Sequence, residues 1–404
     1  MGIELWTGLM VAAGLCVRFA PFIPRRYRVP ASLAVVLAFF IWAPFALDSF
    51  RTFQLSRVAI WVIVAMGLNI LTGYNGQISL GHGALVALGA YTSAILMDNQ
   101  NQLGFVDASP WPFWTTIIVA GGLTAIVGFL LGIPALRLSG PYLAIATLAL
   151  VISFPAVIRK YDGLTGGSQG ISVSQPPPPP FLDFLDRTEW LYFLALFSAV
   201  MMLIIAWSIV NGPLGRAFVA VRDSEVAASA MGINVARTKV AAFTISAFFA
   251  GIAGGLYTQL FGVVAPESID IIVSIQFLTG IVIGGLASIL GSVIGAAALI
   301  FLPSDAPEFV GRLPLVSSSV VERAPGAIQG LIVILVVLLM PYGIAGSFHR
   351  LTRLRPRHLI AGIRGIPAGL RARADGVREN IVWWWEDLPW NRDRVPGAEP
   401  EERG

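Results

Sequence analysis

Charge is scarce in this 404-residue chain: only 12% of its residues are Asp, Glu, Lys or Arg, whereas 56% are hydrophobic, and the mean hydropathy is +0.77. A soluble globular domain carries about 25% charged residues, so the composition excludes that class and also excludes a disordered chain. The sequence also lacks the alternating segments of about 10 residues that build outer-membrane barrels. It contains many apolar runs of about 20 residues, enough for a helix to cross a bilayer. We therefore expect an all-α, polytopic membrane protein.

Cysteine, lysine and histidine are also rare. The single cysteine, Cys16, cannot form a disulfide within the chain. The two lysines, Lys160 and Lys239, do not follow a glycine-rich G-x-x-x-x-G-K-[ST] turn, so the chain has no P-loop for ATP. His82 has no Cys, Asp or Glu at metal-ligand spacing, and the apolar runs offer no nucleophile with a base partner. We expect no enzyme activity, metal or cofactor in this chain.

Charges in the short polar connections indicate the side of the membrane. Arginines at 25–28 and after residue 349 place these segments in the cytoplasm by the positive-inside rule. The run Leu5–Phe22 has no basic residue ahead of it and no cleavage site, so we interpret it as a retained helix. Residues 271–302 are too long for one span and contain Gly284–Gly285, which predicts a hairpin of two short helices. The prediction is about 11 spans, one N-terminal helix plus a core of about 10, with the N-terminus outside and the C-terminus cytoplasmic.

Polar side chains inside the apolar runs concentrate between residues 69 and 91. Such groups are costly in a membrane and mark functional sites by default, and the glycines among them allow a broken helix that lines a cavity. We predict a translocation path lined by Asn69, Asn75, Gln77, Ser79, His82 and Tyr91. For His82 the alternative is a neutral imidazole hydrogen-bonded to a neighbouring helix. No Asp, Glu or Lys lies in the middle of a predicted span, which argues against an ion-driven carrier.

A polar, mixed-charge segment, residues 212–239, lies between two long apolar runs. It predicts two short helices outside the membrane, the second capped by Asp223 and ended by Gly232. The apolar face of the first helix comprises Leu214, Phe218 and Val221. We interpret this segment as a docking surface; the alternative is a solvated connector.

Five motifs occur in order along the chain: G-L-N-I-L-T-G-Y-N-G-Q-I-S-L-G-H-G-A at 67–84, L-R-L-S-G-P-Y-L-A-I-A-T-L-A-L at 136–150, L-T-G-G-S-Q-G-I-S at 164–172, G-R-A-F-V-A-V-R-D-S-E-V-A-A-S-A-M-G-I-N at 215–234 and G-G-L-A-S-I-L-G-S-V-I-G-A at 284–296. Together they resemble the LivM branch of the branched-chain amino-acid ABC transporter permease family. The resemblance covers roughly residues 58–344 and excludes the tail after His349. It implies a core like that of vitamin-B12-importer permeases.

The resemblance also implies partners and roles. In the family, an E-A-A-x-x-x-G loop is similar to the coupling helices that dock on an ATPase; here Val226 stands where alanine or isoleucine is usual. The residues implied at this docking site are Arg216, Arg222, Asp223, Glu225, Ala227, Ala228 and Gly232, the last three keeping the helix thin. The implied partners are a LivH-like second permease, a pair of ATPase subunits that bind ATP and Mg²⁺, and a periplasmic or lipid-anchored substrate-binding protein.

These inferences favour an importer permease for branched-chain or other hydrophobic amino acids, in the bacterial inner membrane, contacting lipid and no nucleic acid. One alternative is a permease of the same architecture for urea, short amides or organic and aromatic acids; the ligand of the binding protein distinguishes it. Another is an ion-coupled secondary carrier, which would transport alone. A membrane scaffold is a poorer alternative, because scaffolding gives no reason for polar side chains at residues 69–91.

The predicted organisation has two parts. Residues 1–348 form the transmembrane domain, in which 212–239 is the cytoplasmic coupling loop and 159–189 is an external loop stiffened by Pro176–Pro180. Residues 349–404 form a cytoplasmic tail with basic residues and tryptophans. The tail either lies on the anionic inner leaflet or is an extension with no role in transport.

Overall fold

The computed structural model describes residues 40–98, 112–138, 140–311 and 330. The chain divides into two compact units, 1–346 and 347–404, and every described residue belongs to the first. The predicted helix Leu5–Phe22 and the tail 349–404 therefore lie outside the described residues.

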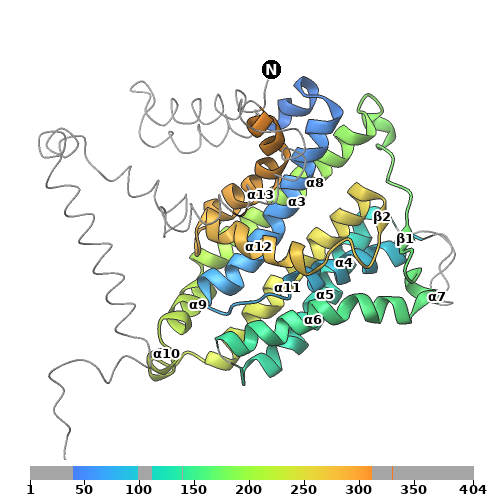
Figure 1. Cartoon of the computed structure of the whole chain (residues 1–404). Helices are drawn as coiled ribbons and strands as arrows, with labels where there is room; N and C mark the ends of the chain where they lie inside the picture. Colours follow the sequence, from blue (N-terminus) through green and yellow to red (C-terminus); the bar gives the residue numbers. More distant parts are fainter. Residues whose placement is uncertain (1–39, 99–111, 139, 312–329, 331–404) are drawn as a thin grey trace, which may run out of the picture. The chain divides into compact units, whose positions relative to one another are not determined.

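The described part of the chain is almost entirely helical (Figure 1). In chain order its elements are α3 (Ser49–Asn69), the π-helix η1 (Ile70–Tyr74), α4 (His82–Met97), α5 (Phe113–Ala135), α6 (Pro141–Lys160), α7 (Asp162–Thr165), β1 (Ile171–Ser172), the 3₁₀ helix η2 (Pro180–Leu182), α8 (Arg187–Asn211), α9 (Pro213–Asp223), α10 (Glu225–Ala230), α11 (Val235–Phe261), β2 (Val263–Val264), α12 (Ile271–Gly284) and α13 (Ile289–Gly311). Five of these helical segments are long and apolar enough to span a membrane. This agrees with the predicted helical membrane class, whereas the predicted total of spans includes residues outside the described ranges.

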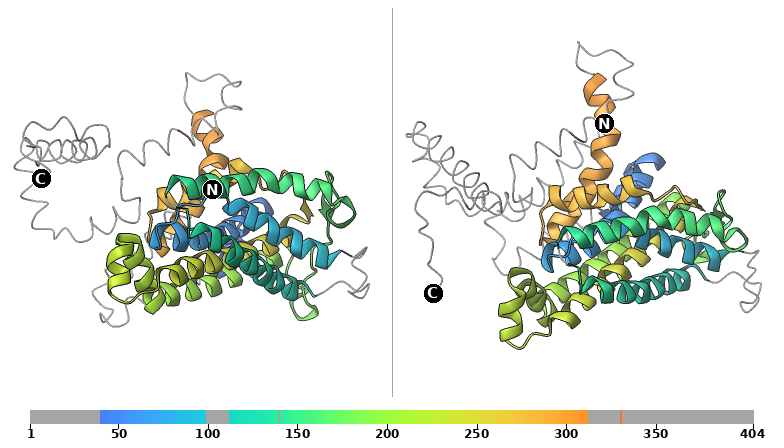
Figure 2. Two further views of the ribbon diagram at one scale, coloured as in Figure 1. Left: turned by 90° about the horizontal axis from the view of Figure 1, so that it is seen from below. Right: turned by 60° about the horizontal axis from the view of Figure 1, so that its bottom comes forward.

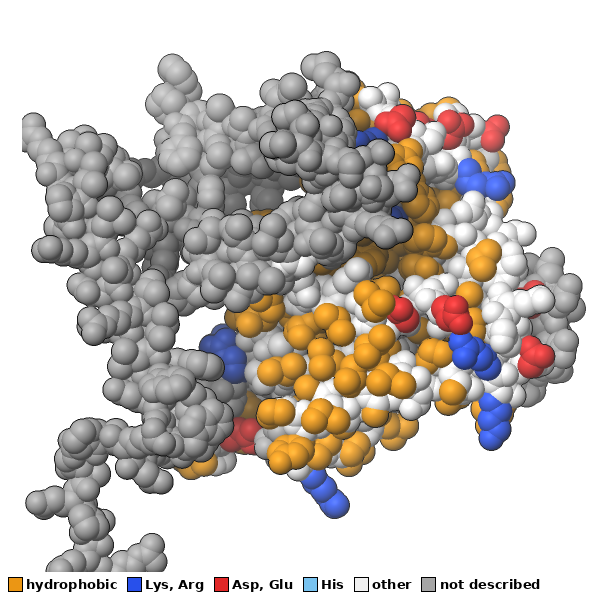
Figure 3. Space-filling model, viewed as in Figure 1, with side chains coloured by type: hydrophobic (Ala, Val, Ile, Leu, Met, Phe, Trp, Pro, Cys, Tyr) orange, Lys and Arg blue, Asp and Glu red, His pale blue; other side chains and the backbone are white. Residues whose placement is uncertain are grey.

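Helices α3 and α11 form the interior of the described bundle. In their most apolar windows, 72% and 67% of residues are buried, against 39%, 28% and 22% for α5, α6 and α8. Helix α11 packs against α3, α4 and α5, and α4 also contacts α6 (Figure 2). Apolar side chains form a broad patch on the described surface, with Lys and Arg at its margins (Figure 3). An apolar exterior is what a helix bundle presents to lipid tails.

Close packing of α11 depends on its glycines. A Cβ atom at Gly254 would collide with the Val86 carbonyl and Ala90 amide of α4, and one at Gly251 would collide with the Ala120 carbonyl of α5. Small residues that let helix backbones approach are the usual basis of helix association in membranes. The glycines at 251 and 254 therefore let α11 pack closely against α5 and α4.

Substitution of Gly254 tests this packing. We expect Gly254→Leu to lower the melting temperature of the purified protein by about 10 °C, because inserting a side chain against backbone atoms costs roughly 3 kcal/mol or more. Gly122→Leu is the matched control, since a Cβ at Gly122 meets nothing within 4 Å. Differential scanning fluorimetry measures both, and an equal effect of the two substitutions would contradict the packing role.

The predicted hairpin at residues 271–302 is present as α12 and α13. The two helices are joined by a turn in which Gly285 has φ 118° and Ala287 has φ 55°. The predicted hairpin ended at residue 302, and this bound was wrong, because α13 continues to Gly311. Membrane helices tolerate an internal proline when neighbouring groups satisfy the freed backbone.

Two helices begin at positions that differ from the starts of the apolar runs in the sequence. Helix α3 begins at Ser49, ahead of the apolar run that starts at Val58, so that it includes Arg57. Helix α4 begins at His82, although an apolar run starts near Ile78. Gly76, with φ +75°, follows the end of η1, and the chain stays irregular from there to Gly81, the N-cap of α4.

The predicted external loop 159–189 contains a short strand. Its β1 pairs antiparallel with β2, with Ile171 opposite Val264. The chain reaches this register through Gly166 and Gly170, which have φ +69° and +74°. The L-T-G-G-S-Q-G-I-S motif therefore shapes the connection between α6 and the strand pair.

Candidate functional site

The predicted docking segment forms two short helices, α9 and α10, between α8 and α11. Ser224 caps α10, because its Oγ accepts a hydrogen bond from the Ala227 amide at 3.2 Å. The prediction that Asp223 is the cap was wrong, since Asp223 is the last residue of α9 and its carboxylate pairs with Arg222 at 2.9 Å. Gly232 ends the pair as predicted, with φ +82°.

Helix α9 buries one face against the rest of the chain. Phe218 and Val221 are 0% and 2% exposed, as their spacing predicts, but Leu214 is 45% exposed. Gly215 takes the inward position, because a Cβ there would collide with the Val210 carbonyl at the end of α8. The first turn of α9 is therefore rotated relative to the predicted face.

Apolar side chains lie uncovered on this polar segment. Val226 and Met231 are 80% and 83% exposed, while Ala228 between them is 3% exposed. Gly232 provides a left-handed turn, and a Cβ there would meet nothing within 4 Å in this chain; its role in fitting an ATPase stays a prediction. Met231 was missed as a site residue. Its signal was an apolar residue in an otherwise polar loop, and such exposed groups mark interaction sites when they occur together.

Glu225 holds α10 to the base of α11. Its Oε1 lies 2.6 Å from Nζ of Lys239, whose side chain is 10% exposed, against 53% for Glu225. Lys239 was missed as a site residue, because its partner is 14 positions away along the sequence. The ion pair fixes the orientation of α10 relative to the bundle.

Arg222 connects α9 to residues 70–81, the stretch of chain between α3 and α4. Its Nη1 donates a hydrogen bond to the Gly73 carbonyl at 3.1 Å. Its aliphatic part covers Gly76, where a Cβ would lie 2.7 Å from Arg222 Cγ. Arg216, by contrast, is exposed, and its hydrogen bond goes to the Asn211 carbonyl at the end of the preceding helix α8, at 3.4 Å. Among the described contacts of these two arginines, only that of Arg222 reaches a segment far away in the sequence.

Asn69, the last residue of α3, connects the start of this stretch to the turn between α12 and α13. Its Nδ2 donates to the Ser288 carbonyl at 2.8 Å and to Ser292 Oγ at 2.9 Å. Its Oδ1 accepts from the Ala287 amide at 2.9 Å. The chain then continues into the π-helix η1, a conformation that is frequent at functional sites. Asn69 therefore holds this turn, and its place on the translocation path stays a prediction.

The chain between η1 and α4 is irregular and passes between α6 and α12. The Leu80 amide donates to Thr147 Oγ1 of α6 at 3.0 Å. Ser274 of α12 accepts from the Gly83 amide at 3.0 Å and donates to the Leu80 carbonyl. Irregular backbone at membrane depth requires protein partners of this kind or a water-filled cavity.

The remaining predicted path residues are buried, and several lack partners. Within the described chain, no hydrogen bond reaches the side-chain polar atoms of Asn75, Gln77 or Tyr91, whereas the fully buried His82 imidazole lies next to the Val64 backbone of α3. Ser79 is 2% exposed and lies in the same irregular segment. Tyr91 lies about 14 Å further along α4 than His82, at 1.5 Å per residue. The structure thus groups Asn75, Gln77, Ser79 and His82 and separates Tyr91 from them.

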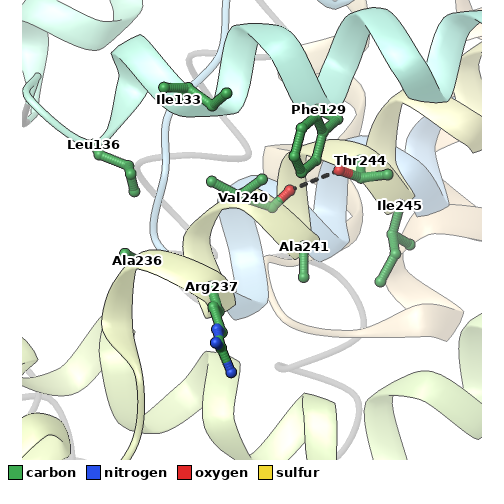
Figure 4. Close-up of a pocket in the computed structure, with 9 residues that line it drawn as sticks. All are labelled: Phe129, Ile133, Leu136, Ala236, Arg237, Val240, Ala241, Thr244 and Ile245. Carbon is green, nitrogen blue, oxygen red and sulfur yellow. Dashed lines mark hydrogen bonds between the residues drawn. The ribbon is translucent and has the colours of Figure 1, made fainter.

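A groove between α5 and α11 has different chemistry. Its volume is about 480 Å³, and Phe129, Ile133 and Val240 are among its lining side chains (Figure 4). Thr244 bonds the carbonyl of its own helix at 2.9 Å, and Arg237 points away from the apolar side chains. The groove offers nothing that would orient a polar solute. The described residues also contain no group of three or more His, Cys, Asp or Glu that could hold a metal ion.

Comparison with known proteins extends these observations. Residues 51–340 match the family described as "Branched-chain amino acid transport system / permease component". The high-affinity branched-chain amino acid transport system permease proteins LivM of Escherichia coli K12 and of Salmonella typhimurium are each 36% identical over 263 residues, covering 60% of this chain and 60% of theirs. LivH of Salmonella typhimurium is 26% identical over 300 residues, covering 71% of this chain and 91% of LivH.

The match to both LivM proteins is thus limited to about three fifths of their length. No solved structure matches the chain. The family match nevertheless covers the described helices from α3 to α13, and α9 and α10 of residues 212–239 are among them. The chain is a multi-pass membrane protein that belongs to the permease-component family of branched-chain amino acid transport systems.

Proposed function

We propose that this chain is a permease subunit of an ABC importer that carries branched-chain or other hydrophobic amino acids. Its partners are a LivH-like second permease, a pair of ATPase subunits and a substrate-binding protein that delivers the solute. The chain itself hydrolyses nothing, and ATP and Mg²⁺ bind to the ATPases. The permease names of the relatives at 36% and 26% identity support this assignment.

The observation that carries the proposal is the construction of α9 and α10. They expose apolar side chains at Val226 and Met231. The ion pair between Glu225 of α10 and Lys239 of α11 attaches them to the helix bundle. A surface that only connects two helices needs neither feature. A surface that receives force from a partner needs both a contact face and rigid attachment.

A continuous set of contacts leads from this surface into the membrane region. Arg222 bonds Gly73 in η1, and Asn69, the residue before η1, bonds the α12–α13 turn at Ala287 and Ser288. Movement of α9 would therefore displace η1 and that turn together. We propose that this displacement changes access to the buried polar residues around Gln77 and His82.

The proposal also includes the type of membrane, the number of spans and the orientation of the chain. We place the protein in a bacterial inner membrane with about 11 spans, the N-terminus outside, and α9 and α10 in the cytoplasm. The 1–348 domain then has the vitamin-B12-importer type of core, and the 349–404 tail is cytoplasmic. Urea, short amides and organic acids are the alternative substrates, and ion-driven transport by the chain alone is the more distant one.

Purification of the tagged chain from its native membranes tests the partnership. We expect ATPase subunits with P-loops and a second permease to co-purify and to be identified by mass spectrometry. We expect Met231→Asp to reduce ATPase recovery about tenfold or more, because it places an unpaired charge in the centre of the apolar contact.

Leu164→Asp is the matched control for that substitution. Leu164 is also an exposed apolar residue, at 41%, but it lies on α7, far along the chain from α9 and α10. We expect this variant to retain the ATPases. Equal ATPase recovery with Met231→Asp and the unmodified chain would contradict docking through this surface.

A further inference from the structure

A second cavity is lined by residues of α3, α4, α11 and α12 and of the connection before α12. Its volume is about 180 Å³. Pockets for drug-sized ligands measure about 300–1,000 Å³, so this one suits a smaller solute. Its lining residues are Arg57, Ile60, Trp61, Val64, Val86, Tyr257, Phe261, Ser268, Ile269, Val273, Gln276 and Phe277.

Arg57 is the only charged residue among the described residues that line this cavity. Its Nε is inaccessible to solvent and has no hydrogen-bond partner within the described part of the chain. The described lining contains no Asp or Glu that could pair with the guanidinium. Arg57 is half-buried within the apolar helix α3, and a charged side chain in such a segment marks a functional site by default.

The rest of the lining is rigid and mainly apolar. Trp61 and Phe277 pack edge to face with ring centroids 4.7 Å apart, and Tyr257 stacks on Phe261 at 4.2 Å. These pairs hold the aromatic walls, and aliphatic side chains of α3 and α4 complete the surface. The cavity thus offers a fixed apolar surface with a single cationic group.

We propose that this cavity binds a small apolar solute through its carboxylate, with Arg57 as the carboxylate-binding residue. The fork of guanidinium donors matches the geometry of a carboxylate and forms charge-assisted bonds with it. The hydrocarbon part of the solute lies against Ile60, Val64 and Val86, which are 2%, 0% and 2% exposed. The inference rests on the proposed function and deepens it, because it gives the permease a solute site of its own.

Binding to the purified permease–ATPase complex without the binding protein tests the site. The probes are L-leucine, isocaproate, which keeps the carboxylate and lacks the amine, and isoamylamine, which keeps the amine and lacks the carboxylate. We expect the first two to bind and isoamylamine not to bind. Arg57→Gln should weaken isocaproate binding about tenfold or more, since charge-assisted hydrogen bonds contribute about 1.5–3 kcal/mol. Arg187→Gln is the matched control, because Arg187 is exposed at the start of α8 and should leave binding unchanged.

A labelling experiment gives a readout that needs no transport. In a Cys16→Ala background, Ser268→Cys places a thiol in the cavity lining, and anionic and cationic thiol reagents are compared. We expect the ratio of anionic to cationic reaction rates to fall about tenfold when Arg57→Gln is added, because the guanidinium favours the anion. Isocaproate should protect the thiol only when Arg57 is present.

The outcomes separate the two proposals. Unchanged isocaproate binding in Arg57→Gln, equal binding of isoamylamine, or no binding by the unmodified complex would overturn the site. If the complex fails to transport with ATP but isocaproate protects the thiol through Arg57, the importer proposal fails and the carboxylate site stands.

Discussion

Replacing Arg222 by alanine is expected to reduce ATP-driven uptake about 10- to 100-fold while the ATPase subunits remain bound. Arg222 is the contact from α9 to the η1 segment, through its hydrogen bond to the Gly73 carbonyl at 3.1 Å. A hydrogen bond from a charged group contributes about 1.5–3 kcal/mol, which corresponds to this range of effect. The exposed faces of Val226 and Met231 are untouched, so docking should persist. Uptake into proteoliposomes and ATPase co-purification measure the two quantities.

Asp223→Ala is the control for the Arg222 substitution. It removes the ion pair between adjacent residues at 2.9 Å but leaves the bond to Gly73. Such an exposed pair contributes about 0–1 kcal/mol, so uptake should change less than about fivefold. If Asp223→Ala reduced uptake as strongly as Arg222→Ala, the path through Gly73 would not be the route of coupling.

Breaking the Glu225–Lys239 pair is expected to have the second large effect. Glu225→Gln leaves Lys239, with a side chain only 10% exposed, without its carboxylate partner. We expect ATPase recovery and uptake to fall together, because α10 loses its attachment to α11. We expect the free energy of ATPase binding to weaken by about 1–2 kcal/mol. This is less than for a fully buried ion pair, because Glu225 is 53% exposed and water screens its charge.

Charge reversal distinguishes the pair from its separate residues. Glu225→Lys and Lys239→Glu should each disrupt ATPase recovery, and the double variant should recover a substantial part of it. A double-mutant cycle of ATPase affinity gives the interaction energy. Additive effects of the two reversals would show that the 2.6 Å contact does not hold α10 in place.

Hydropathy and motif spacing were sufficient to predict the helical class and the presence of two short helices at residues 212–239. Both depend on local properties, namely apolar run length and the polarity of a connection. The end of the segment at Gly232 was predictable for the same reason, because few other residues adopt φ +82° without strain. The cap was not, since Asp223 and Ser224 have equally suitable side chains and only the backbone distinguishes them.

Contacts between residues far apart in the chain could not be predicted from the sequence. Asn69 was assigned to the translocation path because it is polar, but its amide is fully engaged by the turn more than 200 residues later. Arg57 comes just before the apolar run that begins at Val58, yet α3 begins at Ser49 and includes it. Only the structure shows that Arg57 lines a cavity formed by four helices, with its Nε lacking a hydrogen-bond partner among the described residues. Polarity locates candidate residues, and tertiary packing decides which of them have spare hydrogen-bonding capacity.

The source of energy for transport distinguishes an ABC importer from an ion-driven carrier. The decisive measurement is uptake of radiolabelled L-leucine into proteoliposomes that contain this chain with its second permease and ATPases, with the binding protein outside. We expect uptake that requires internal ATP and the binding protein and that persists when ionophores collapse ion gradients. Uptake by liposomes containing this chain alone, driven by an ion gradient without ATP, would contradict the importer proposal.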